Sequence, residues 1–143
     1  MSSLYDRDFY AWANEQAALL RAGQWSAADV AHIAEEIESM GRSEKRELVS
    51  RLTVLLLHLL KWQFQPALRG NSWRLSVANA RDRLVDHLDD NPSLKAKLPD
   101  ATASAYRYAR REASAESGLP EDIFPSDCPW SFKTLMAQDF WPE

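Results

Sequence analysis

The chain has 143 residues, of which 45% are hydrophobic and 27% charged, and its formal net charge is −4 at pH 7. A chain of this length suits one domain, residues 1–143, with a real hydrophobic core. The single cysteine, Cys128, excludes an internal disulfide, and the most apolar run, 48–60, is interrupted by polar residues and is too short to span a membrane. The N-terminus lacks the basic then apolar order of a signal peptide, so a cytoplasmic location is expected.

Charge is distributed unevenly along the chain. Residues 1–43 hold 7 acidic and 3 basic side chains, residues 44–83 hold 3 and 8, and residues 84–143 hold 11 and 6, which gives segment charges of −4, +5 and −5. The basic 44–83 segment suggests a surface that binds anions or nucleic acid. Pairing with the acidic flanks inside the protein explains the same pattern, and we favour that interpretation.

Two helices are expected in the N-terminal third. The first covers about residues 4–22, with Ser3 as its N-cap and Gly23 as its stop, and the second follows a capping box formed by Ser26 and Asp29. Each has an apolar stripe that we expect to face inward. The stripes are Tyr5, Phe9, Trp12, Gln16, Leu19 and Leu20 in the first helix, and Val30, Ile33, Ile37 and Met40 in the second.

The central helix is the most apolar part of the sequence. Its apolar residues recur with a 4,3,4,3 spacing, which defines one helical face: Leu48, Leu52, Leu55, Leu59 and Trp62. It should end near Gln65, because the residue before Pro66 is pushed out of the helical region. Gly41 either ends the preceding helix, with Ser43 capping a new one, or lies inside one continuous helix; the pattern leaves both open.

Two further helices and a terminal strap complete the expected fold. A helix over about 72–90, capped by Asn71 or Ser72, should be followed by another from Asp100 to just before Gly118. Three prolines forbid a long helix after that, so residues 119–143 are predicted to be an aromatic and proline-rich strap packed on the bundle, with one short helix near 131–138. The predicted fold class is all-α, a compact helical bundle of about four to five helices.

Polar residues gather at the edge of the central apolar face and form a candidate seam. At 100° per residue, Glu44, Glu47, Arg51, His58 and Trp62 lie within about 60° of one another. A histidine there can carry a proton or bind a ligand, and it can equally be a structural residue. Arg51 can bind an anion or pair with Glu47. The next helix has an apolar stripe of Trp73, Val77, Ala80, Leu84 and Leu88. Arg81 lies on the flank of this stripe, where we expect it to reach a buried carboxylate.

One group of residues has the composition of a metal site, but we do not predict that it binds a metal. His32, Glu35, Glu36 and Glu38 have suitable residue types, but the inward stripe of their helix leaves His32 and Glu35 pointing mostly outward. We therefore expect a solvated acidic face, with no metal and no cofactor. His87, among three aspartates at a helix end, is a weak site, and Cys128 is read as a packing residue.

Several phrases of the sequence resemble the DUF29 family in the family's own order. They are YDRDFYAW at Tyr5, QAALLRAG at Gln16, EEIESMGRSE at Glu35, LLLHLLKWQFQP ending at Pro66, NSWR at Asn71, NPSLK at Asn91 and FPSDCPW at Phe124. The resemblance implies a compact all-helical bacterial protein and carries no established activity. The recurring words of the family include Arg42, Ser43, Glu44, Arg51, His58, Lys61, Trp62, Gln65, Pro66 and Trp73, which overlap the seam.

Three hypotheses about function follow. A non-enzymatic interaction or regulatory protein is favoured, with a protein partner or self-association and no membrane partner. The alternatives are nucleic-acid or anion binding through the 44–83 segment, and an enzyme that uses His58 with Glu44, Glu47 and Arg51. The candidate residues, as a site or as a structural network, are Arg42, Glu44, Glu47, Arg51, His58, Trp62, Arg69, Arg74 and Arg81.

Overall fold

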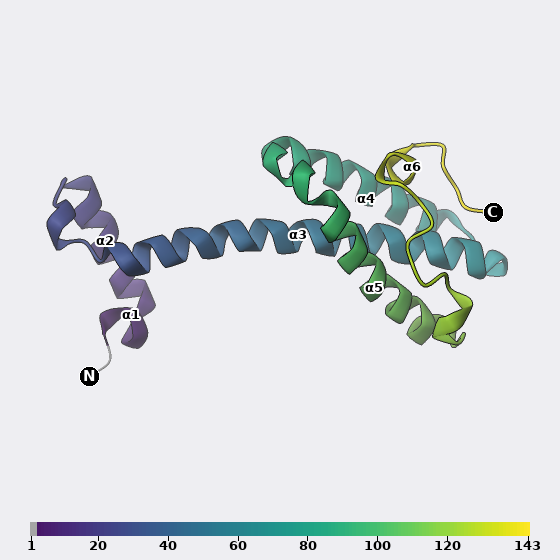
Figure 1. Ribbon diagram of the computed structural model, residues 1–143, viewed down its shortest axis with the longest axis horizontal. Helices are drawn as coiled ribbons and strands as arrows, with labels where there is room; N and C mark the ends of the chain where they lie inside the picture. The colour runs from purple at the N-terminus through teal and green to yellow at the C-terminus, as the bar shows by residue number, and fades with distance from the viewer. Residues whose placement is uncertain (1–2) are drawn as a thin grey trace. The chain divides into compact units, whose positions relative to one another are not determined.

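The computed structural model describes residues 3–143, in which the regular secondary structure is helical and no β-strand occurs (Figure 1). The all-α prediction is therefore confirmed. The α-helices are α1 (Leu4–Arg7), α2 (Phe9–Arg21), α3 (Val30–Phe64), α4 (Asn71–Asp90), α5 (Leu98–Ser117) and α6 (Phe132–Met136). Contacts group the chain into an N-terminal unit, residues 1–43, and a C-terminal unit, residues 44–143. Because α3 belongs to both, one domain over 1–143 stays a prediction.

The first helix of the N-terminal unit is interrupted, contrary to the prediction of one helix over 4–22. Asp8 leaves the helical region, with φ −152° and ψ 84°, and its Oδ1 accepts a hydrogen bond from the Ala11 N–H at 3.0 Å. Asp8 is thus the N-cap of α2 and separates it from α1. At the other end, Gly23 takes a positive φ of 72° and ends α2, as predicted.

Helix α3 is continuous through Gly41, which decides the alternative left open by the sequence. A Cβ atom at Gly41 would meet nothing within 4 Å, so the glycine marks neither a turn nor a tight contact. The helix ends at Phe64, immediately before Gln65 and Pro66, as the restriction imposed by proline predicts.

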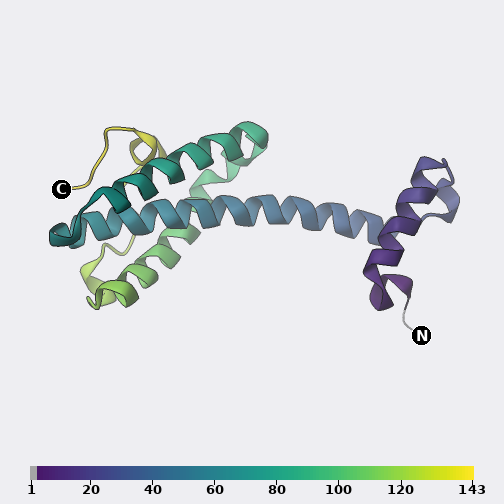
Figure 2. The ribbon, with the colours of Figure 1, turned by 180° about the vertical axis from the view of Figure 1, so that it is seen from behind.

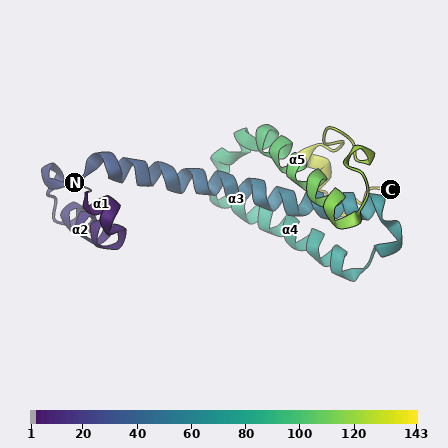
Figure 3. The same cartoon turned by 90° about the horizontal axis from the view of Figure 1, so that it is seen from below.

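The C-terminal half of α3 lies between α4 and α5 in the core of the C-terminal unit (Figures 1, 2 and 3). The leucines at its centre have no exposed surface, and they include Leu48, Leu52, Leu55, Leu56, Leu59 and Leu60. On α5, alanines recur at every fourth position from Ala101 to Ala113 and are buried, which lets the helices approach closely. The apolar run is therefore protein core, as predicted.

The starts of α4 and α5 differ from the prediction. The N-cap of α4 is Gly70, in extended backbone, rather than Asn71 or Ser72. Helix α5 begins at Leu98, two residues before Asp100, because Pro99 lies in the first turn, where its missing N–H costs no hydrogen bond.

The segment 119–143 packs on the helices of its own C-terminal unit, as predicted for a strap. It contains α6, which is shorter than the predicted 131–138. Its Phe124 and Leu135 are buried, and Phe124 meets the ring of Phe64 with centroids 4.9 Å apart. The half-buried Cys128 Sγ lies 3.4 Å from the Trp130 carbonyl oxygen, and burial raises the pKa of this thiol. Cys128 thus has the environment of a packing residue rather than of a nucleophile.

The prediction that the apolar stripe in the N-terminal part of α3 faces inward is wrong. The exposed fractions of Val30, Ile37 and Met40 are 66%, 58% and 62%. In the preceding helix, Trp12 and Gln16 are buried as predicted, whereas Phe9 is 50% exposed. Helical spacing shows which residues share a face, but it does not show whether the same chain covers that face.

Candidate functional site

The predicted polar seam separates into groups with different partners. Arg51 Nη2 lies 2.5 Å from Oε1 of Glu47, one turn earlier on α3. His58 is half-buried, and its Nδ1 lies 2.8 Å from the Val54 carbonyl oxygen on the same helix. A carbonyl oxygen only accepts, so Nδ1 carries the hydrogen and donates it. His58 therefore bonds to its own helix, while Arg51 and Glu47 form an ion pair.

Trp62 is the centre of a second group. Its buried ring lies 4.2 Å from the ring of Trp141, between centroids, so the end of the chain packs on α3. The guanidinium groups of Arg69 and Arg74 lie 5.1 and 5.2 Å from the Trp62 ring centroid, within cation–π range. Arg69 Nε also donates to the Trp62 carbonyl oxygen at 2.7 Å. Both arginines thus stabilise the connection between α3 and α4.

Arg81 fastens the C-terminal segment to α4. It is 1% exposed and donates to three backbone carbonyl oxygens: Leu135 at 2.8 Å, Gln138 at 3.3 Å and Phe140 at 2.8 Å. The prediction that Arg81 reaches a buried carboxylate is therefore wrong. Backbone carbonyl oxygens in α6 and just after it accept its hydrogen bonds instead. Burial lowers the pKa of the guanidinium, against a smaller opposing effect of Asp139. Arg81 is a structural anchor.

A polar cavity of about 450 Å³ lies between α3 and α4 of the C-terminal unit. From α3 it receives Glu44 and Glu47, and from α4 the buried His87. His87 Nε2 lies 2.9 Å from the Glu44 carbonyl oxygen, and Nδ1 lies 3.7 Å from Oε2 of the same residue. One ligand atom from each of the three side chains lies within 4.8 Å of the others. The prediction that His87 is a weak site stays a prediction; its position three residues after the buried Leu84 places it beside the apolar stripe of α4.

The motif of His32 and three glutamates does not form a common site in the N-terminal unit. His32 turns to Asp29, and Glu36 accepts a hydrogen bond from the hydroxyl of Tyr5. Glu38 pairs instead with Arg42, at 3.9 Å between exposed side chains. A pair of this kind contributes little to stability.

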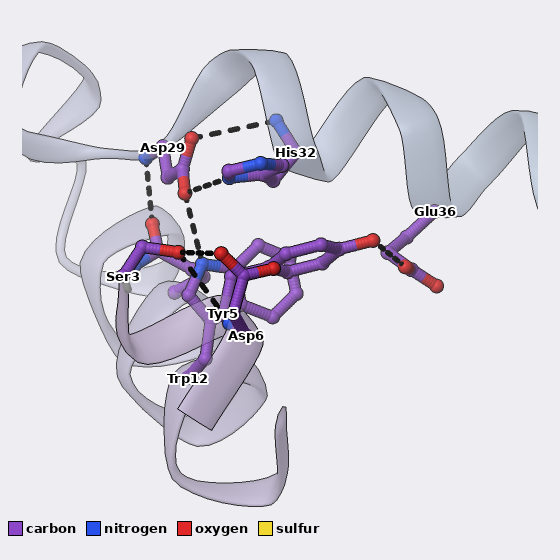
Figure 4. A network of polar contacts seen from close by, with 8 residues as sticks. Ser3, Tyr5, Asp6, Trp12, Asp29, His32 and Glu36 are labelled. Carbon is purple, nitrogen blue, oxygen red and sulfur yellow. Dashed lines mark hydrogen bonds and ion pairs between the residues drawn. The ribbon is translucent and has the colours of Figure 1, made fainter. Parts of the chain in front are cut away.

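A polar network holds α1 and α2 against the start of α3 (Figure 4). Asp29 is its centre: Oδ2 accepts from Trp12 Nε1 at 3.0 Å and lies 2.7 Å from His32 Nδ1. The backbone N–H of Asp29 donates to Gln16 Oε1 at 2.7 Å. Tyr5 stacks on His32 with centroids 4.0 Å apart and nearly parallel rings. These contacts connect α1 and α2 to α3, whereas the hydrophobic core found among the described residues lies in the C-terminal unit.

The pKa values in this network are displaced in the directions its contacts require. The hydrogen bond from His32 lowers the pKa of Asp29, and the same bond raises the pKa of His32. The hydrogen bond to Glu36 raises the pKa of Tyr5 to about 12. At neutral pH the Tyr5 hydroxyl therefore keeps its proton and its role as donor.

The N-terminal unit leaves many large apolar side chains in solvent, in contrast to the buried polar network. On α3 these belong to the predicted stripe of Val30, Ile33, Ile37 and Met40, of which only Ile33 is half-buried; we call this set the α3 apolar stripe. The other exposed large apolar residues between positions 3 and 43 are Phe9, Tyr10, Leu20 and Trp25. Exposed apolar surface of this kind is typical of sites that bind other proteins.

None of the helices among residues 3–143 is long and apolar enough to cross a membrane. Nucleic-acid binding and catalysis at the seam are not decided by the geometry and stay predictions. Among known proteins, no curated protein and no solved structure matches the chain. A family model described as "Domain of unknown function DUF29" matches residues 4–141. The resemblance found in the sequence is therefore confirmed, and the chain belongs to the DUF29 family.

Proposed function

We propose that this protein is a non-enzymatic interaction protein whose N-terminal unit binds a helix of a protein partner through the α3 apolar stripe. One observation supports this most: Val30, Ile37 and Met40 recur at helical spacing and are each more than half exposed. A cytoplasmic setting for the interaction stays a prediction.

The spacing of the stripe suits a helical partner. Its residues are separated by 3, 4 and 3 positions, which is the pattern of the a and d positions of a heptad repeat. Small residues, Ala34 and Gly41, lie seven apart along one flank of the stripe and are exposed. They give a second helix room to approach, since only a methyl group projects at Ala34 and only a hydrogen at Gly41. The stripe thus has the form of one half of a two-helix seam.

Charge indicates the kind of partner. Residues 1–43 carry a net charge of −4, with Glu36 beside the stripe and Glu35 and Glu38 further round the helix. Two copies paired antiparallel about the middle of the stripe would bring these carboxylates together, which is unfavourable. A helix with basic residues on either side of its apolar face complements the stripe and also gains electrostatic steering. We therefore commit to a separate protein partner with a basic amphipathic helix.

Titration of labelled peptides tests the proposal. One amphipathic helical peptide has lysines beside its leucine stripe, a second has glutamates there, and a third has the first composition in scrambled order. We expect saturable binding, measured by fluorescence anisotropy, for the basic peptide alone, and its loss in an Ile37→Glu variant. Leu75→Glu is the matched control, because Leu75 is 62% exposed on α4 in the C-terminal unit.

Two results would overturn the proposal. One is equal binding of the basic peptide by the wild type and Ile37→Glu, which would place its site elsewhere. The other is a stable dimer of the wild-type chain, measured by light scattering, that Ile37→Glu dissociates; the stripe would then bind a second copy of this chain.

A further inference from the structure

We propose that Glu44, Glu47 and His87 form a binding site for a divalent transition-metal ion between α3 and α4. This inference does not depend on the proposed function, because all three residues belong to the C-terminal unit. The imidazole and the two carboxylates are ligands that suit Zn²⁺. One candidate ligand atom from each lies within 4.8 Å of the others.

The buried histidine is already oriented as a metal ligand. His87 is 7% exposed, and its Nε2 lies 2.9 Å from the Glu44 carbonyl oxygen, so Nε2 carries the hydrogen and donates it. In the neutral imidazole, Nδ1 then has a lone pair, and Oε2 of Glu44 lies 3.7 Å away. A metal-bound histidine commonly donates its second N–H to a backbone carbonyl in this way, which fixes the tautomer and the ring. Two acceptors that face each other favour a cation between them.

The two carboxylates can adjust to an ion while the imidazole stays fixed. Glu44 and Glu47 are three residues apart on α3, so both project to the same side of that helix. Their side chains are 47% and 43% exposed, so each has room to turn, although Glu47 must share its carboxylate with Arg51. Ligand atoms around tetrahedral Zn²⁺ lie about 3.4 Å apart, as bond lengths of roughly 2.1 Å require. A small movement of both glutamate side chains would bring the three ligand atoms from their present separations, up to 4.8 Å, to this spacing.

The charge of the cavity suits a doubly charged ion. Its lining contains four carboxylates, from Glu44, Glu47, Asp86 and Asp90, and two guanidinium groups, from Arg51 and Arg83. Four negative and two positive charges leave −2. Arg51 is paired with Glu47 at 2.5 Å, so it competes with the ion for one carboxylate oxygen. The cavity has room for water at the remaining coordination position, and the ion would fasten α3 to α4.

The site is tested by titrating the tag-free protein with Zn²⁺ at neutral pH and measuring the heat of binding by isothermal calorimetry. We expect one equivalent of bound Zn²⁺ and a higher thermal midpoint in its presence. Glu44→Gln and Glu47→Gln, at partly exposed positions that do not threaten folding, should each weaken binding about tenfold or more, because even loss of an outer partner has that effect. His87→Ala should abolish the visible spectrum of the Co²⁺ complex. The controls are His58→Ala and Asp89→Asn, which should bind like the wild type.

Three results would contradict the proposed metal site. Absence of saturable Zn²⁺ binding would mean that His87 and Glu44 only pair with each other. Binding that survives both glutamine variants would place the ion at other side chains. Equal losses in Glu47→Gln and His58→Ala would mean that the histidine outside the cavity matters as much as the proposed ligand, which contradicts the proposal.

Discussion

The two units of this chain use apolar side chains in different ways. In the C-terminal unit, leucines such as Leu56 are completely buried in a core made by α3, α4 and α5. Among residues 3–43 of the N-terminal unit only Trp12 and Gln16 are buried, and contacts around Asp29 hold the helices together. One helix, α3, supplies a core in one unit and an exposed stripe in the other. The same residue spacing can therefore encode internal packing or an interaction surface.

The largest expected effect separates the two parts of α3. Leu56→Ala should lower the free energy of unfolding by about 3 kcal/mol, because it leaves a cavity among fully buried residues. Ile37→Ala, in the exposed stripe, should change it by about 0.5 kcal/mol or less. Urea denaturation of both variants measures the difference. Similar losses would mean that Ile37 is covered within the free protein.

Removal of the buried arginine should have the next effect. Arg81→Met keeps much of the side-chain volume but leaves three carbonyl oxygens without their donor, so we expect a loss of about 2–3 kcal/mol. Hydrogen exchange should then increase in residues 131–141. Arg83→Met, at an exposed position of α4, is the control. An unchanged exchange rate near α6 would contradict the anchoring role.

Two glycines should respond in opposite directions. Gly118 ends α5 with a φ of 77°, which an alanine adopts only with strain, so Gly118→Ala should cost about 1 kcal/mol. Gly41 lies in the interior of α3 with open space around its Cβ position, so Gly41→Ala should stabilise by about 0.5–1 kcal/mol. Thermal unfolding of both variants checks the signs. Destabilisation by Gly41→Ala would contradict the continuous helix.

The smallest expected effect is a dependence of the N-terminal unit on pH. The bond to Asp29 raises the pKa of His32 above its ordinary 6.5, with smaller contributions from Glu35 and Asp6, and Tyr5 stacks on the ring. Protonated His32 therefore stabilises the fold fully below about pH 6.5, and this contribution is lost as pH rises through the raised pKa. Because the pKa of Asp29 is lowered, its contribution is lost only in acid.

Hydrogen exchange of α1 and α2 at pH 6 and pH 8, corrected for the intrinsic rates, measures this dependence. Protection should fall at the higher pH in the wild type and in His58→Gln, but not in His32→Gln. An increase in protection from pH 6 to pH 8 would reverse the sign and contradict the role of His32.

Much of the fold follows from local sequence signals. The leucine spacing of the central helix, Pro66, and the glycines at positions 23 and 118 each act within a few residues, so they predict helices and their ends well. The break at Asp8 is not predictable from this pattern, because an aspartate inside a helical apolar periodicity looks the same whether it caps a new helix or lies within one. The exposure of the α3 apolar stripe was missed because burial depends on what lies opposite, which periodicity does not contain.

The candidate sites were less predictable for the same reason. The seam groups residues by their angle on α3, yet His58 bonds to its own backbone there. On α4, Arg81 bonds to carbonyl groups more than 50 positions away. Glu44 and Glu47 were found from the helix that carries them. His87, on another helix, comes beside them only through tertiary packing, so no local pattern could join the three.

Methyl NMR of the chain during addition of the basic amphipathic peptide tests the central claim most directly. We expect that the resonances of Ile33, Ile37 and Met40 shift and saturate together, while those of Leu75 and Val85, exposed on α4, stay in place. Saturable shifts at Leu75 and Val85, with the α3 apolar stripe unchanged, would show that the partner helix binds the C-terminal unit and not the stripe.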